Sequence, residues 1–331
     1  MSQNIRRRIV VAAGGLLVAP MASFAQQPSR VWRIGFLTNG TVTSAGGQLE
    51  AFRRGLNELG YFEGRNFIIE SRWAEGKLDR LPALVSELLA QKLDVIYAPS
   101  GVAAQATKRS GTTIPIVFAL APDPIGQGFG TSLPRPGGNM TGLTSTHTEL
   151  SAKRFELLKE VSPAIRRVAV LYFLAPSAAG VAEQLAETEQ AAKILGVTIV
   201  TEESPQVEDF ERAFASIQKH RPDALIVIEN PMFFTHRVRL TELAASLRIP
   251  AIYNVSEYVH AGGLMSYGAS YADLSRRAAS HVVKILNGRK PGDLPIERPT
   301  RFELAINMKT ARAIGLRIPQ SVLLRADATV E

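Results

Sequence analysis

Hydrophobic positions along the chain follow two alternating patterns, which predict a succession of strands and helices. Short runs rich in β-branched and aromatic residues are typical of buried strands, and apolar residues spaced three or four apart are typical of helices. Leu49, Phe52 and Leu56 have the helical spacing, and Gly60 is a stop signal. In the first half we expect strands at 33–37, 66–73, 94–98 and 115–120, and helices at 49–60 and 78–92.

The same rhythm restarts in the second half of the chain. We expect helices at 153–161, 182–196, 207–220 and 238–248, and strands at 167–173, 197–203, 224–228, 251–254 and 263–268. Strands that alternate with helices form parallel sheets covered by helices on both faces. The sequence therefore predicts an α/β protein with two doubly wound, Rossmann-like lobes.

The stretch RPGGNMTGLTST, residues 135–146, lies between these two runs and is a candidate crossover. Pro136, Gly137 and Gly138 bend its approach, and 139–145 has the character of a short edge strand. A plain loop between domains is the alternative interpretation.

Residues 1–25 differ from the rest of the chain and resemble a secretory leader. A basic start, MSQNIRRR, precedes the apolar run IVVAAGGLLVAP and the small residues around Ala25. The run is shorter than the ~20 apolar residues that span a bilayer, which disfavours a membrane anchor. We expect cleavage after Ala25, a mature start at Gln26 and a periplasmic protein, exported by either the general or the twin-arginine route.

Charge and composition narrow the function classes. The net charge of +8 falls to +5 without the three arginines of the leader. No dense Lys/Arg cluster with interleaved aromatics occurs, so we expect no nucleic-acid partner. Zero cysteine excludes disulfides and thiolate chemistry.

Catalytic and cofactor motifs are missing from the sequence. The histidines at 147, 220, 236, 260 and 281 have no helical metal-pair spacing, and no nucleophile elbow, phosphate loop or dinucleotide fingerprint occurs. GQGFGT, at 126–131, resembles a glycine fingerprint only superficially, because it leads to Pro134 instead of a helix. We therefore expect no cofactor, no metal and no catalytic residue.

Polar side chains follow the predicted strands at their carboxyl ends, where open α/β sheets bind ligands. Hydroxyls, amides and small residues dominate there, which favours binding a polar molecule over catalysis. Ser100 and Gly101 open a helix whose N–H groups suit an anion, although Ser100 can also act simply as its cap. The candidate ligand-binding residues are Thr38, Asn39, Ser100, Gly101, Asp123, Ser145, Phe173, Glu229, Asn230, Ser256, Glu257 and Tyr267.

Several long stretches resemble the ABC transporter substrate-binding proteins related to tryptophan- and tyrosine-binding lipoproteins, within the periplasmic-binding-protein-like class I fold. The resemblance is collinear over nearly the whole mature chain. It rests on IGFLTNG (34–40), AFRRGLNELGYFEGRNFIIESRWAEGKLDRLPALVSELL (51–89), IPIVFALAPDPIGQGFGTSLPRPGGNMTGLT (114–144), KRFELLKEVSP (153–163), AGGLMSYGAS (261–270) and ILNGRKPGDLPIERPTRFELAINMKTARAIGL (285–316).

The resemblance implies a two-lobed clamshell with three hinge crossings that captures a small solute. It would present the solute to an inner-membrane ABC permease, and we expect a monomer. It also implies that a late segment returns to the first lobe. The implied lobes are 30–144 plus 268–290, and 145–267 plus 300–320.

The solute is left open at this point. Gram-positive binders of aromatic amino acids carry an acidic Ser-Asp-Glu loop, whereas the corresponding loop here reads YNVSEY. For an amino-acid solute, Glu257, Glu229 or Asp123 would have to take the place of that loop and pair with the ammonium group. A secreted hydrolase-like α/β enzyme is the alternative function. A transcription regulator of the same fold is disfavoured because the leader occupies the place of a DNA-binding motif.

Overall fold

Two β-sheets organise this computed structural model, which describes residues 30–145, 150–174, 180–228 and 230–331. The first sheet has the strand order β2-β1-β3-β4-β5, and all of its strand pairs are parallel. Its strands are β1 (Trp32–Thr38), β2 (Phe67–Trp73), β3 (Val95–Tyr97), β4 (Ile116–Ala121) and β5 (Met140–Thr144). The helices packed on it are α1 (Val42–Glu58), α2 (Leu81–Leu89), α3 (Gly101–Arg109) and α10 (Tyr271–Leu286).

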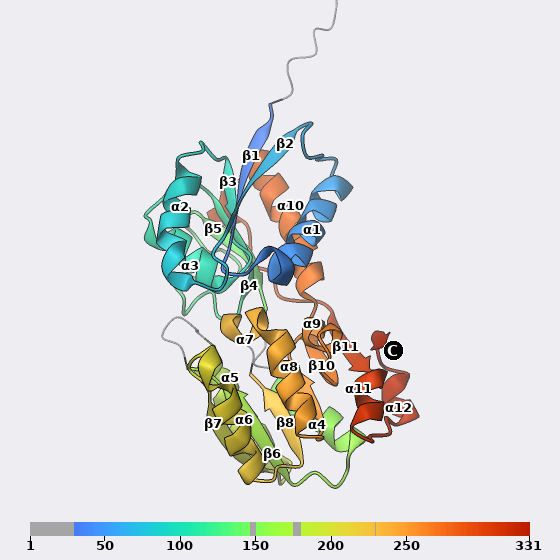
Figure 1. Ribbon diagram of the computed structural model, residues 1–331. Helices are drawn as coiled ribbons and strands as arrows, with labels where there is room; N and C mark the ends of the chain where they lie inside the picture. The colour runs from blue at the N-terminus through green and yellow to red at the C-terminus, as the bar shows by residue number, and fades with distance from the viewer. Residues whose placement is uncertain (1–29, 146–149, 175–179, 229) are drawn as a thin grey trace, which may run out of the picture. The chain divides into compact units, whose positions relative to one another are not determined.

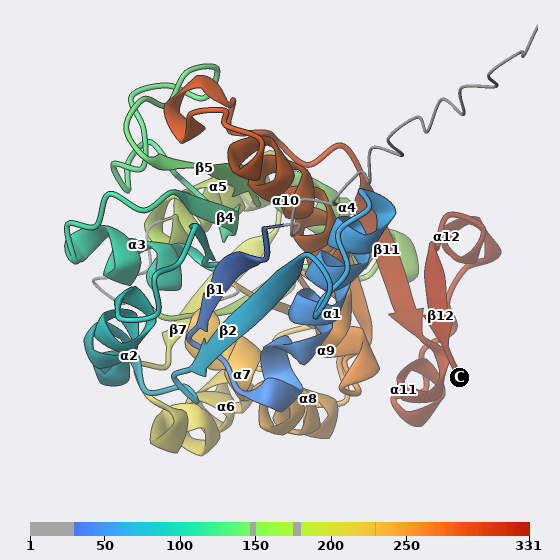
Figure 2. The ribbon, with the colours of Figure 1, turned by 90° about the horizontal axis from the view of Figure 1, so that it is seen from above.

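Helices cover both faces of the first sheet, so the inner strands β3 and β4 are apolar and buried on both sides. Ile34 and Phe36 belong to the buried cluster that includes α1 and α10, whereas Leu37 belongs to the cluster that includes α2 and α3. Successive side chains of a strand point to opposite faces, which produces this division. Figures 1 and 2 show α2 and α3 on one side of β1 and α1 and α10 on the other.

Helix α1 begins at Val42, earlier than the predicted start at Leu49. Thr41 and Ser44 form a reciprocal capping box, in which the Ser44 backbone N–H donates to Thr41 Oγ1 at 3.0 Å. This cap satisfies N–H groups that would otherwise lack partners at the helix start. The early start brings Gly40 and Ala45 to the carboxyl end of β1.

Helix α10 returns from the second half of the chain to pack on α1. The close approach requires Gly55, because a Cβ atom there would lie 2.1 Å from the Arg276 carbonyl oxygen. The chain thus joins its early and late segments in one layer, as the family resemblance implies.

Strand β5 lies at the edge of the first sheet, as the sequence pattern of 139–145 predicts. A segment after α10 runs along its outer side, where the Thr144 N–H donates to the Glu297 carbonyl at 2.9 Å and the Glu297 N–H to Gly142 at 2.9 Å. These bonds cover an edge that would otherwise be open to pairing with another chain.

The second sheet has the order β12-β11-β10-β9-β8-β6-β7 and is parallel except where β10 and β11 run antiparallel. Its strands are β6 (Arg167–Tyr172), β7 (Thr198–Glu203), β8 (Ala224–Val227), β9 (Ala251–Tyr253), β10 (Met265–Ala269), β11 (Phe302–Asn307) and β12 (Ala328–Val330). Its helices are α4 (Ser151–Val161), α5 (Val181–Ile194), α6 (Phe210–Lys219), α7 (Pro231–Thr235), α8 (Arg237–Ser246), α9 (Ser256–His260), α11 (Met308–Ala313) and α12 (Gln320–Leu323).

The predicted fold class, two doubly wound α/β lobes, is confirmed by these two sheets. We call the first sheet with α1, α2, α3 and α10 the first lobe, and the second sheet with its helices the second lobe. Elements β12, α7 and α12 were not predicted, because they are only three to five residues long and too short for a periodic pattern. The exact boundaries of the lobes stay a prediction.

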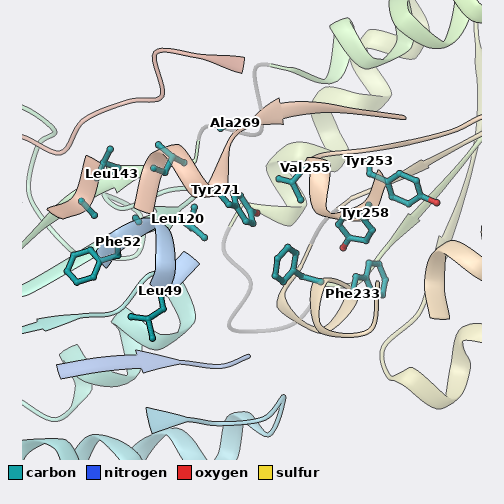
Figure 3. Packing of buried hydrophobic residues seen from close by; sticks show 14 of the residues in the cluster. Leu49, Phe52, Leu120, Leu143, Phe233, Tyr253, Val255, Tyr258, Ala269 and Tyr271 are labelled. Atoms are coloured by element: carbon teal, nitrogen blue, oxygen red, sulfur yellow. The ribbon is translucent and has the colours of Figure 1, made fainter. Parts of the chain in front are cut away.

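One buried cluster contains residues of both lobes. Figure 3 shows Leu49 and Phe52 from α1 on one side and Tyr253 and Tyr258 on the other, with Tyr271 at the start of α10 between them. Within the described residues, no helix combines the length and the apolar character that a membrane crossing needs.

Candidate functional site

The strand order reverses once near the middle of the first sheet and once near one edge of the second. In the first sheet the chain moves from β1 outward to β2 and then back past β1 to β3; in the second it moves from β6 to β7 and back to β8. The loops that follow such strands diverge and leave a crevice at the carboxyl ends. Thr38 and Ser100 lie at the first crevice, and Gly180 and Asn230 at the second.

A cavity of about 90 Å³ is lined from both crevices. The first lobe contributes residues from the loops after β1, β3, β4 and β5, and the second contributes the amino ends of α5 and α7. The lining residues are Thr38, Asn39, Gly40, Ala45, Gln48, Ser100, Gly101, Val102, Leu120, Pro122, Gln127, Ser145, Gly180, Val181, Gln184, Asn230, Pro231, Phe234 and Tyr271.

The polar groups of the first crevice are largely paired with one another. Ser100 Oγ donates to Asn39 Oδ1 at 2.6 Å and accepts from the Ala103 N–H at 3.2 Å, which caps α3. Thr38 Oγ1 accepts from the Gly40 N–H at 3.1 Å. The bond between Ser100 and Asn39 holds the β1 and β3 loops together across the crevice.

The second crevice presents amide groups that are only half satisfied. Asn230 Oδ1 accepts from the N–H groups of Met232 at 2.9 Å and Phe233 at 3.0 Å, so it caps α7. This pairing fixes the amide orientation and leaves the nitrogen facing elsewhere. Gln184 Oε1 accepts from Asn254 Nδ2 at 3.4 Å.

Four polar atoms of the cavity lining are buried and lack a hydrogen-bond partner among the described residues. They are Asn230 Nδ2, Gln184 Nε2, Ser145 Oγ and Gln127 Oε1. Asn230, Gln184 and Ser145 are each at most 3% exposed. A buried polar group without a partner costs the folded state about 1–3 kcal/mol of free energy. Four such groups around one cavity therefore indicate a ligand-binding site, in which the ligand supplies the missing partners.

The remaining lining is apolar or neutral. No aspartate, glutamate, lysine, arginine or histidine occurs among the lining residues of the described chain. Leu120, Val102 and Val181 supply aliphatic surface, and the rings of Phe234 and Tyr271 lie with their centroids 5.6 Å apart. The cavity therefore combines a few convergent polar groups with apolar walls, as small-molecule sites do.

Six of the predicted ligand-binding residues line this cavity: Thr38, Asn39, Ser100, Gly101, Ser145 and Asn230. Glu229 lies outside the described residues. The other five predicted residues, Asp123, Phe173, Ser256, Glu257 and Tyr267, do not line it. The binding role of every residue in the predicted set stays a prediction.

Local contacts account for the positions of these five residues. Asp123 Oδ1 accepts from the Gly126 N–H at 2.9 Å within its own turn. Phe173 packs against the larger buried cluster, and Tyr267 packs against Phe302 with ring centroids 6.3 Å apart. Ser256 is the first residue of α9, which follows β9 instead of a strand at the reversal point.

Glu257, in the first turn of α9, has a buried Oε2 atom without a hydrogen-bond partner among the described residues. Burial raises the pKa of this carboxyl, and Arg237 opposes the shift only in part. The charged form is therefore disfavoured in the folded protein.

Several lining residues were not predicted from the sequence, above all Gln184, Gln127, Phe234 and Tyr271. Gln184 lies on the buried face in the first turns of α5, and Tyr271 is the first residue of α10. Reading only the loop after each strand overlooks such positions. For Gln184 and Phe234, the useful signal would have been the start of a helix that follows a reversal strand, β6 or β8. No group of three metal-ligating side chains occurs within the described residues.

Comparison with known proteins shows a family match over most of the chain. The model of a family described as ABC transporter substrate binding protein matches residues 44–330. The tyrosine-binding protein of Clostridioides difficile is 26% identical over 268 residues, which are 81% of this chain and 76% of that protein.

Two solved structures are similar in fold and sequence. One is the ABC domain from Streptococcus pneumonia in complex with L-Trp, with 25% identity and a TM-score of 0.83 over 91% of this chain and 100% of that one. The other is a conserved domain protein from Vibrio cholerae, with 25% identity and a TM-score of 0.82 at the same coverage. The resemblance drawn from the sequence is confirmed.

Proposed function

Because the chain belongs to the ABC transporter substrate-binding protein family, we propose that the cavity between the two crevices is the site where it binds its solute. The solute-binding role follows from the family; the location of the site is the proposal. The observation that carries it is the set of buried donors on Asn230, Gln184 and Ser145 that have no partner within the described part of the chain. A solute with acceptor atoms would satisfy all three at once.

The solute is a small organic compound with both polar and apolar parts. Of the relatives described above, one is named for tyrosine binding and one holds L-Trp. An aromatic or aliphatic body fits the walls formed by Leu120, Phe234 and Tyr271. The polar part lies against the second crevice, where the unpaired amides are. Burial of both parts supplies affinity, and the amides supply orientation.

The protein acts as the capture component of an ABC importer. It works in the periplasm after cleavage of residues 1–25, as a monomer, and delivers the solute to an inner-membrane permease. Capture closes the lobes around the solute by a hinge motion at the segments that connect the two sheets, such as the one between β10 and α10. None of the matched relatives described above is named as an enzyme, and no observation favours the hydrolase-like alternative.

The decisive experiment is native mass spectrometry of protein purified without refolding, for the parent chain and for Asn230→Ala and Gln184→Leu. We expect the parent to retain a small-molecule adduct that both variants lose. Asn57→Asp, an exposed change on α1, is the control and should retain it. An adduct that all four proteins retain equally would place the solute elsewhere and contradict the proposal.

Export is tested separately. Amino-terminal sequencing of the periplasmic protein should read from Gln26, and a product that retains Met1 in the membrane fraction would contradict the leader assignment.

A further inference from the structure

Resting on the proposed role of the cavity as the solute site, we infer that the solute is an organic acid whose carboxylate is its only charge. The cavity offers hydrogen-bond donors in excess at the second crevice and no acidic side chain in the described part of its lining. This pattern selects for a carboxylate and against an ammonium group.

Three side-chain donors converge on the cavity without a partner in the described residues. Asn230 Nδ2 and Gln184 Nε2 can only donate, and Ser145 Oγ can donate its proton. Asn230 cannot turn its amide without losing the two bonds that cap α7. Gln184 directs its amide oxygen at Asn254 Nδ2, at 3.4 Å, and in this orientation its nitrogen is left for the cavity. An acceptor with several lone pairs, such as a carboxylate, can satisfy all three.

Helix amino ends add positive potential to the same space. Helix α3 begins at Gly101 and α5 at Val181, and both residues line the cavity. Gly180, which precedes α5 with φ of +93°, has no side chain to cap the first N–H groups of the helix. Each helix end corresponds to roughly half a positive charge, so these two ends can balance one carboxylate but not a dianion.

An ammonium group would find no ionic partner among the described lining residues. Of the three carboxylates that the sequence analysis considered, Asp123 is bonded within its own turn, Glu257 is not part of the lining, and Glu229 lies outside the described residues. A buried ammonium without a counter-charge, close to two positive helix ends, is strongly disfavoured. The acceptor Gln127 Oε1 suits a neutral donor on the solute, such as a hydroxyl.

The test is competition among matched compounds that differ only in charge. Hydrocinnamate, L-phenylalanine, phenethylamine and hydrocinnamide share one body; isocaproate, L-leucine, isoamylamine and isocaproamide share a second; indolepropionate, L-tryptophan and tryptamine share a third. The mature protein is stripped of solute, mixed with all compounds at equal concentration and analysed by native mass spectrometry, with titration calorimetry on the compounds retained. We expect at least one acid to exceed its matching amino acid and amine by about 10- to 100-fold.

Isosteric variants test the donors. Asn230→Asp keeps the α7 cap, because aspartate caps as well as asparagine, but replaces the free donor by a negative oxygen. It should lower affinity for the acid at least about 10-fold and leave the matching amide less affected. Gln184→Glu should act in the same direction, and Asn57→Asp, the same change on an exposed helix face, should have no effect.

Each remaining outcome overturns the inference. If an amino acid or amine binds as tightly as its matching acid, the solute class is wrong; the variant Glu229→Gln then shows whether Glu229 supplies the counter-charge. In that case the proposed function stands provided Asn230→Asp still alters binding. If no member of the panel binds, the class is also wrong. The proposed function itself fails only if the natively captured adduct is indifferent to Asn230→Ala and Gln184→Leu.

Discussion

The two crevices that line the cavity differ in how their polar groups are satisfied. In the first, Asn39, Ser100 and Thr38 bond to one another or to nearby backbone. In the second, Asn230 and Gln184 each use the amide oxygen within the protein and leave the nitrogen unpaired in the described structure. The loops after β1 and β3 are thus paired within the protein, whereas the second crevice, together with Ser145 and Gln127 of the first lobe, has polar atoms that a solute can pair with.

Because of this difference, we expect the paired side chains of the first crevice to contribute mainly to the stability of the fold and the amides of the second crevice mainly to solute binding. A paired group contributes to the folded state, and its removal leaves a buried partner unsatisfied. An unpaired group costs stability until a ligand arrives, which is a common compromise at functional sites. Substitutions in the two crevices should therefore have opposite effects on melting and on binding.

The largest expected effect is on binding, from Gln184→Leu in the second crevice. Leucine is similar in size to glutamine but has no amide, so the variant loses the Nε2 donor, which has no partner among the described residues. Solute affinity should fall about 10- to 100-fold, as for the loss of a hydrogen bond to a charged group. The melting temperature should stay the same or rise, apart from the weak 3.4 Å contact with Asn254. Calorimetry with the captured solute and thermal melts measure both. Unchanged affinity would show that the Gln184 amide does not bind the solute, and the contrast between the two crevices would then not hold.

The next effect is on stability, from Ser100→Ala in the first crevice. The variant loses the α3 cap and leaves Asn39 without its donor, so the free energy of unfolding should fall by about 1–2 kcal/mol. Solute affinity should fall less than in Gln184→Leu. Urea denaturation measures the loss, and Ser100→Thr should restore most of it. A stable Ser100→Ala protein that no longer binds would show that Ser100 contacts the solute directly.

A smaller effect should come from Glu257→Gln in the second lobe. Burial raises the folded-state pKa of Glu257, so its contribution to stability is present below the unfolded pKa and lost as pH rises through the folded pKa. The variant should therefore melt above the parent at about pH 8 and converge with it near pH 4. Melting curves across that range check the sign. Destabilisation by Glu257→Gln at the higher pH would indicate that the charged carboxylate has a partner.

The smallest expected effect, of opposite sign, concerns His281 on α10 in the first lobe. The ring is 1% exposed and its Nε2 lies 3.0 Å from the Pro295 carbonyl oxygen, so Nε2 carries the proton and donates. Burial lowers the pKa of His281, although the Pro295 bond and Glu297 oppose this. The stability contribution is therefore present above the unfolded pKa and lost as pH falls.

The matched variant is His281→Gln, which can donate to the same carbonyl without titrating. Between about pH 7.5 and 5 the melting temperature of the parent should fall by more than that of the variant. Parallel melting curves for the two proteins would show that His281 does not titrate in this range.

The sequence predicts the two α/β lobes and six of the nineteen residues that line the cavity, because both depend on local patterns. Buried strands such as β4 are short apolar runs, and Ser100 follows its strand directly in the chain. The reversal of strand order depends on which strands pair, and no local pattern records pairing. For that reason the sequence did not separate Asn230, which follows a reversal strand, from Ser256, which follows its neighbour.

The hydrogen bonds between side chains could not be predicted from the sequence either. Asn39 and Ser100 are far apart in the chain and meet only because β1 and β3 are adjacent. Gln184 lies in a helix, where an isolated glutamine is normally expected at the surface. Its burial follows from the packing of α5 on the second sheet.

A crystal structure of the protein with its captured solute would show directly whether Asn230 and Gln184 bind the solute through the amide nitrogens that lack partners in the described structure. We expect acceptor atoms of the solute within hydrogen-bond distance, about 2.7–3.2 Å, of both Asn230 Nδ2 and Gln184 Nε2. A solute bound elsewhere, or bound in this cavity while both nitrogens remain unpaired, would contradict this expectation.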